Sequence, residues 1–276
     1  MSISDLDPGV VALAGDWHGR LGFASDAIRA ACEHGAEAIV HLGDFGYLFE
    51  PSYLHGLDAV LEGIPLFFID GNHEDFAYLE SKPLAEDGTR PLSRHVLHLP
   101  RGLRWTWRGR SWLALGGAHS VDRMSREPGV SWWPQERLTE EDVRRVSEPG
   151  HADVLVCHDP PAGVDAPKGY GDARFPLVDE ELGERHRGLV RRVVDAATPR
   201  LIAHGHFHAR YRSTLGGATV LGLAHDGTSV AENLAWLDAE RLELLPPTAE
   251  LREIPPMTEA QPPQHGTEPA EDPASS

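Results

Sequence analysis

The sequence has few cysteines and no long hydrophobic run. Cys32 and Cys157 are its two cysteines and lack C-x-x-C spacing, which argues against a disulfide framework or a thiolate zinc site and favours a reducing compartment. Residues 1–7 are acidic and lack the basic and apolar regions of a signal peptide. The apolar runs 10–14 and 64–69 are far shorter than the ~18 residues that a membrane helix needs. We therefore expect a cytoplasmic protein with no membrane partner.

Positive charge is also scarce, since Lys82 and Lys168 are the only lysines and the formal net charge is −18. This balance argues against broad binding to a nucleic-acid backbone. Hydrophobic residues make up 41% of the 276 residues, enough for a substantial core. From about residue 246 the chain is rich in Pro, Glu and Ser and poor in large apolar residues. We expect one domain over residues 1–245 and a disordered Pro/Glu-rich tail over residues 246–276.

Short apolar runs alternate with amphipathic segments through much of the chain. The predicted strands are residues 10–14, 38–42, 64–69, 103–107, 112–115, 154–157 and 201–203, followed by three antiparallel strands near 211, 219–223 and 234–237. The predicted helices are residues 20–34, 53–61, a short helix starting near Thr139, and 179–197. Residues 118–134 form a long loop that suggests a functional cap. This order predicts an α/β fold whose site lies at the carboxyl ends of parallel strands.

Five segments end in groups that bind metal ions. They are Asp16-Trp17-His18, Gly43-Asp44, Gly71-Asn72-His73-Glu74, Cys157-His158 and Gly205-His206-Phe207-His208. Asp16 and His18 are two residues apart, as are His206 and His208, so each pair can project two ligands to one side of an extended segment. Mixed carboxylate, imidazole and amide ligands suit Mn, Fe or Zn. Two metals about 3.5–4 Å apart are a recurring device for hydrolysing phosphate esters.

The order of these motifs resembles that of the calcineurin-like metallophosphoesterase superfamily: D-x-H, G-D, G-N-H-[DE], a lone His and G-H-x-H. The first three motifs are also similar to those of phosphoprotein phosphatases, whereas Gly205-His206-Phe207-His208 resembles the broader phosphoesterase branch. Residues 116–123 and 131–136 resemble small bacterial and phage metallophosphoesterases. The resemblance implies an α/β fold, a two-sheet αββα sandwich, and a hydrolase with two divalent transition metal ions.

The resemblance also implies roles for individual residues. It assigns the first metal to Asp16, His18, Asp44 and His208, and the second to Asp44, Asn72, His158 and His206, with Asp44 as the shared bridge. A shared carboxylate is physically sensible because it offsets part of the repulsion between two nearby dications. The resemblance makes His73 the proton donor to the leaving oxygen; the alternative is that His73 only orients its loop.

The chain departs from the phosphoprotein phosphatases at two places. Phe45-Gly46-Tyr47 follows Asp44 without their Asp-Arg pair, and Asp70 stands where they carry another arginine. Arg20, Arg123 or Arg126 could bind phosphate instead, or could be solvated surface arginines.

Several other residues have two interpretations. His119 could face the site or be a plain loop histidine, while His204 and His225 could orient metal ligands. Trp132 and Trp133 could wall a base-binding pocket, although we favour packing for them and for Cys157.

The leading functional expectation is a phosphomonoesterase or protein phosphatase acting on a phosphorylated small molecule or a phosphoprotein. The alternative is a phosphodiesterase acting on cyclic nucleotides or nucleic acid. A non-catalytic binding module of the same fold ranks third, because such a module should have lost ligands or the proton donor.

Overall fold

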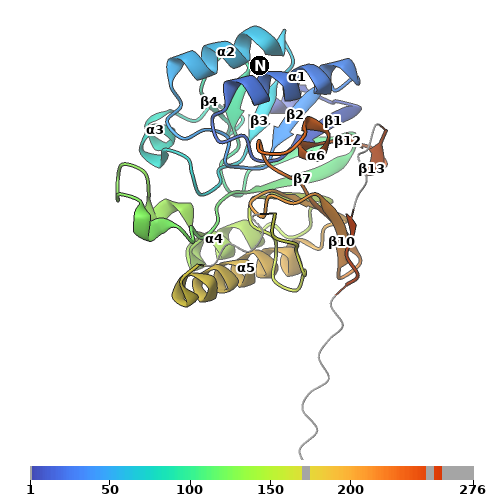
Figure 1. Ribbon diagram of the computed structural model, residues 1–276. Helices are drawn as coiled ribbons and strands as arrows, with labels where there is room; N and C mark the ends of the chain where they lie inside the picture. Colours follow the sequence, from blue (N-terminus) through green and yellow to red (C-terminus); the bar gives the residue numbers. More distant parts are fainter. Residues whose placement is uncertain (1, 170–174, 247–251, 257–276) are drawn as a thin grey trace, which may run out of the picture.

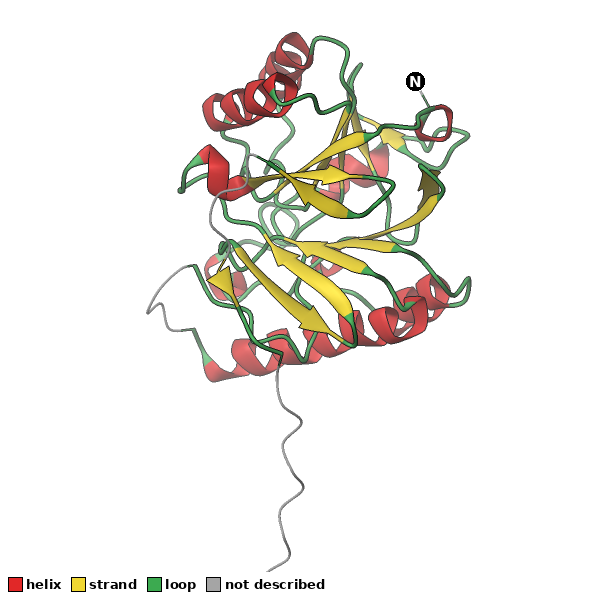
Figure 2. Ribbon diagram, turned by 90° about the vertical axis from the view of Figure 1, so that its right-hand side faces the viewer, coloured by secondary structure: helices red, strands yellow, loops and turns green. Residues whose placement is uncertain are grey.

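The computed structural model describes residues 2–169, 175–246 and 252–256. Two seven-stranded sheets pack against each other, and helices cover the outer face of each sheet (Figures 1 and 2). This arrangement confirms the predicted αββα sandwich.

The first sheet has the order β13-β12-β1-β2-β3-β5-β4, in which β1, β2, β3 and β5 are parallel. Its strands are β1 (Val10–Ala14), β2 (Ala38–His41), β3 (Leu66–Phe68), β4 (Arg90–Pro91), β5 (Val96–His98), β12 (Leu234–Asp238) and β13 (Glu243–Leu245). Helices α1 (Leu21–Glu33), α2 (Pro51–Leu61), α3 (Phe76–Ser81) and α6 (Val230–Asn233) accompany this sheet.

The second sheet has the order β14-β10-β11-β9-β8-β7-β6. Its strands are β6 (Arg104–Trp107), β7 (Arg110–Leu115), β8 (Val154–Cys157), β9 (Leu201–His204), β10 (Tyr211–Leu215), β11 (Ala218–Gly222) and β14 (Arg252–Glu253). Helices α4 (Glu140–Ser147) and α5 (Leu177–Ala197) cover its outer face (Figure 1). Thr139 caps α4 as predicted, in a capping box with Asp142.

The continuous apolar runs of the sequence become strands that are buried on both faces. In β1, Val11 and Leu13 enter the core between the sheets, while Ala12 and Ala14 pack under α1 and α2. Alternate residues of a strand point to opposite faces, so such a run must lie between two layers. The carboxyl ends of these strands are thereby fixed on rigid elements.

Two regions differ from expectation. The three strands expected to be antiparallel divide between the sheets, because β12 pairs with β1 whereas β11 pairs antiparallel with β10 and parallel with β9. Within the expected tail, β14 pairs with β10, and the Ile254 N–H donates to the Arg212 carbonyl at 2.7 Å. Residues 247–251 and 257–276 lie outside the described residues, so the tail remains a prediction. None of the described helices is long and apolar enough to cross a membrane.

Candidate metal centre

The predicted ligands all follow parallel strands, at the edge where the two sheets meet. Asp16 and His18 follow β1, Asp44 follows β2, Asn72 follows β3, His158 follows β8, and His206 and His208 follow β9. Three of these strands belong to the first sheet and two to the second. The site is therefore assembled from both halves of the sandwich.

Asp44 lies at the middle of this group. Its Oδ2 atom is 3.5 Å from His18 Nε2, and its Oδ1 atom is 3.4 Å from His158 Nε2. Each carboxylate oxygen therefore faces a different histidine, an arrangement that suits a carboxylate shared by two metals. Asp16, His18 and Asp44 form one cluster with ligand atoms within 4.8 Å of one another, and Asp44, His158 and His206 form a second.

The other two predicted ligands complete these clusters. His208 Nε2 is 3.1 Å from Asp16 Oδ2, and Asn72 Oδ1 is 3.2 Å from His158 Nε2. The structure thus brings together all seven residues that the sequence proposed as ligands.

Hydrogen bonds fix which nitrogen of two histidines faces the centre. His158 Nδ1 donates to the Leu42 carbonyl at 2.7 Å, and His18 Nδ1 donates to Asp226 Oδ1 at 2.7 Å. In both residues Nε2 is left to face Asp44, as a metal ligand would. Asp226 lies 208 positions from His18 and belongs to none of the five motifs, so the sequence alone did not indicate it.

Glu74, like Asp226, has a structural role that the sequence alone did not indicate. Its buried carboxylate accepts the Phe45 N–H and the Gly71 N–H, each at 2.6 Å. It therefore ties the loop of Asp44 to the loop of Asn72. Glu74 is the acidic residue that ends the third motif. The motif identified this residue, but it did not indicate that Glu74 joins the two loops.

The backbone packs closely around the predicted ligands. A Cβ atom on Gly71 would lie 2.2 Å from Asp44 Oδ1, and one on Gly205 would lie 2.1 Å from Asp16 Oδ1. Four predicted ligands adopt left-handed backbone: His18 (φ 46°), Asp44 (φ 53°), His206 (φ 61°) and His208 (φ 57°). Such conformations cost about 1–3 kcal/mol each and gather at functional sites. The donor set and its close glycine packing therefore fit the expected dinuclear centre.

Charge is concentrated at this centre. Burial favours neutral Asp16, but its hydrogen bond with His208 and the nearby His158 lower the pKa of Asp16 to about 2. Burial disfavours charged His18, yet hydrogen bonds to Asp226 and Asp44 raise its pKa to about 11. Burial likewise opposes charged His158, and the charge of Asp44 raises its pKa to about 10. Since a histidine binds a metal through a neutral ring, cations entering this site would release protons.

His73 lies beside the centre without joining it. Its backbone N–H donates to Asp44 Oδ1 at 3.0 Å, and its ring meets the edge of the Tyr47 ring at 5.2 Å. Burial lowers the pKa of His73. Within the described part of the chain, no side chain hydrogen-bonds to the His73 ring, so the ring nitrogens can hydrogen-bond to a substrate.

The candidate phosphate-binding arginines are engaged with protein groups. Arg20 lies 3.1 Å from Asp226 Oδ2, and Arg123 Nε donates to Asp179 Oδ1 at 2.7 Å. Arg126 is nearly buried and donates to the Asn72 carbonyl at 2.9 Å and to Glu136 at 2.7 Å. Arg126 therefore positions the loop that carries Asn72. A substrate contact by Arg20 or Arg123 stays a prediction.

The remaining candidate residues differ in the groups that they contact. His225 stacks on His208 with ring centroids 4.3 Å apart, whereas His204 bonds to the Tyr211 hydroxyl. His119 lies 3.1 Å from Asp179 Oδ1, in the wall of the cavity described next. Cys157 is fully buried, as its predicted packing role requires, and Trp133 is 7% exposed.

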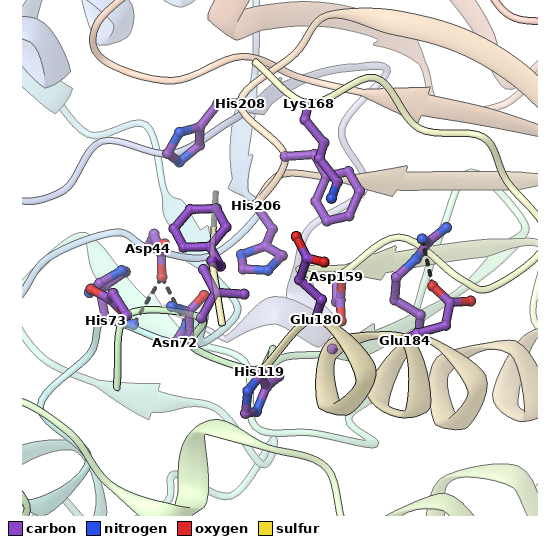
Figure 3. Close-up of a pocket in the computed structure, with 16 residues that line it drawn as sticks. Asp44, Asn72, His73, His119, Asp159, Lys168, Glu180, Glu184, His206 and His208 are labelled. Carbon is purple, nitrogen blue, oxygen red and sulfur yellow. Dashed lines mark hydrogen bonds and ion pairs between the residues drawn. The ribbon is translucent and has the colours of Figure 1, made fainter. Parts of the chain in front are cut away.

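A cavity of about 250 Å³ opens onto the ligands (Figure 3). Asp44, Asn72, His73, His206 and His208 lie along one part of its wall. Glu180 and Glu184 project from α5 on the other side. The cavity therefore gives a small molecule access to the proposed metals and to His73.

Comparisons with known proteins agree with this geometry. Residues 9–210 match the family model for calcineurin-like phosphoesterases, so the chain belongs to that family, as the motifs predicted. By this membership it is a phosphoester hydrolase. No curated protein matches the sequence.

Two solved structures illustrate the shared fold. TT1561 of Thermus thermophilus is 15% identical, with 86% of this chain and 97% of that chain covered and a TM-score of 0.51. A dimetal phosphatase from Danio rerio is 14% identical, with 83% and 92% covered and a TM-score of 0.52. At these identities the likeness shows the fold.

Proposed function

We propose that this chain hydrolyses phosphate esters at a dinuclear centre of divalent transition metals held by Asp16, His18, Asp44, Asn72, His158, His206 and His208. The observation that carries the proposal is the position of Asp44, whose two oxygens face His18 and His158 separately. When bound, the metals would acidify a water molecule and neutralise charge on the phosphoryl oxygens. Manganese, iron and zinc each suit these ligands.

His73 would supply the proton that the leaving group needs. Attack by water oxygen forms one P–O bond, and the P–O bond to the leaving group breaks with its electrons on the leaving oxygen. A protonated His73 ring, which is a stronger acid because burial lowers its pKa, gives its proton to that oxygen and is recharged from the attacking water or from solvent. The hydrogen bond from its backbone N–H to Asp44 Oδ1 keeps His73 next to the proposed bridging carboxylate.

The charges around the centre bear on the class of ester. The first three motifs support a phosphomonoester or phosphoprotein substrate, whose phosphate is a dianion. Arg20, Arg123 and Arg126 are already paired with carboxylates, however, and five acidic residues, Glu180 and Glu184 among them, line the cavity against the two basic residues Lys168 and Arg187. A phosphodiester carries one negative charge and needs less cationic help. These charges support a phosphodiester as the preferred substrate.

The test compares matched aryl phosphate monoesters and diesters, with Mn, Zn and Fe supplied in turn. We expect metal-dependent turnover and a higher kcat/KM for the diester. Faster hydrolysis of the monoester would restore the phosphomonoesterase interpretation. No turnover of either ester by protein shown to hold two metals would refute the proposed hydrolysis.

His73→Ala tests the proton donor separately. The variant should retain both metals and lose about 10²–10⁴-fold in turnover of esters with basic leaving groups, but much less for aryl esters. Equal losses for all leaving groups would assign His73 to positioning, and loss of a metal would make it a supporting residue of the centre.

A further inference from the structure

A second hollow shares His73 and Asp122 with the cavity of Figure 3. Its volume is about 450 Å³, and its apolar walls come from Tyr47, Leu48, Val130 and Trp133. Leu48 and Val130 are each 57% exposed, and Tyr47 is 44% exposed. Contiguous exposed apolar side chains beside a polar centre often mark a binding surface. None of the seven predicted metal ligands lines this hollow.

The position of His73 indicates which part of a substrate would reach this hollow. A general acid must approach the leaving oxygen to about 2.6–3.2 Å. The phosphoryl group belongs with the metal ligands, which line the first cavity. A leaving group that extends past His73 would enter the hollow, which none of the predicted ligands lines.

The walls of this hollow are held by the same groups that hold the centre. The Tyr47 ring meets His73 edge-on at 5.2 Å and stacks on His18 at 5.9 Å. Arg126 donates to the Asn72 carbonyl at 2.9 Å and to the Ser131 carbonyl at 2.6 Å. The turn that carries Val130 is thereby tied to the loop of Asn72, and the hollow is preformed.

We propose that the hollow walled by Tyr47, Leu48, Val130 and Trp133 binds the leaving group and selects esters whose leaving group carries an aromatic ring, such as an aryl or nucleoside group. The inference rests on the proposed hydrolysis. Aromatic and branched apolar walls offer a planar ring both contact area and favourable edge or face packing. A small alkyl leaving group would leave these walls in contact with water.

The experiment uses two esters that differ only in their leaving groups. One releases a naphthol, and the other releases a small fluorinated alcohol of the same pKa, so both need equal help from His73. The protein variants are Leu48→Ser combined with Val130→Ser, and Tyr47→Ala. Leu84→Ser is the matched control, because Leu84 is 56% exposed and lines neither hollow.

Wild type and Leu84→Ser should prefer the naphthyl ester by at least about tenfold in kcat/KM, the range expected for apolar contacts in a binding pocket. The double variant should lose about tenfold on that ester and nothing on the alkyl ester. Tyr47 touches His73, so its variant should affect both esters but the naphthyl ester more. No turnover of either ester by metal-loaded wild type would contradict the proposed function itself. Turnover without preference, or equal losses on both esters in the double variant, would overturn the leaving-group pocket alone.

Discussion

Gly71 provides the sharpest test of how tightly the candidate centre is packed. Its φ is not in the left-handed region, so alanine is acceptable to the backbone and only the added methyl group matters. That Cβ would lie 2.2 Å from Asp44 Oδ1 and 2.8 Å from His158 Nε2. Carbon and oxygen atoms rarely approach closer than about 3.4 Å without strain, since contacts of 3.5–4.0 Å are optimal for carbon pairs. Asp44 or the whole loop must therefore move by roughly 1 Å.

A shift of that size has two measurable consequences. Metal–ligand bonds tolerate only about ±0.2 Å, so Gly71→Ala should lose at least one metal and most of its turnover. Overpacking should also destabilise the metal-free protein by about 1–3 kcal/mol. At about 2–4 °C per kcal/mol for a chain of this size, the Tm should fall measurably.

The assay combines elemental analysis, turnover and thermal unfolding with and without metal. Gly188→Ala is the control, because Gly188 lies within α5 and has nothing within 4 Å of an added Cβ. That change should leave metals and turnover intact and stabilise by up to about 1 kcal/mol. If Gly71→Ala kept two metals and full turnover, Asp44 and His158 would not be ligands of one close-packed centre.

Four further predictions follow from the same geometry. Reconstituted protein should contain two transition metals per chain by elemental analysis, and one or none would contradict the dinuclear centre. Asp44→Asn removes the shared negative charge, so metal affinity and turnover should both collapse; near-normal activity would exclude Asp44 as the bridge. Asp226→Ala removes the orienting bond to His18 and should weaken metal binding by about 10–100-fold in a metal titration, whereas unchanged affinity would show that His18 needs no such support. Deleting residues 257–276 should leave Tm and turnover unchanged, while deleting residues 252–276 also removes β14 and should lower Tm; equal Tm values for both deletions would show that β14 adds no stability.

The sequence by itself determined the main strands and helices and all seven candidate ligands, although it did not indicate short elements such as α3, β4 and β13. Buried strands such as Val10–Ala14 are continuous apolar runs, and the polar groups that follow them stand out by contrast. The resemblance that these motifs carry implied that Asp44 is shared between the metals and that His73, next to Asn72, lies outside the ligand set. These signals are local, so no knowledge of distant contacts was needed to read them.

The tertiary structure decided the contacts between residues far apart in the chain. Asp226 reaches His18 from 208 positions away, and Arg126 reaches the Asn72 carbonyl from 54 positions away. Both partnerships depend on how the two sheets bring their loops to one edge, which no local pattern encodes. The same assembly paired the candidate arginines with carboxylates and set an apolar hollow beside His73. Sheet topology, rather than residue type, thus decided which charges remain available to a substrate.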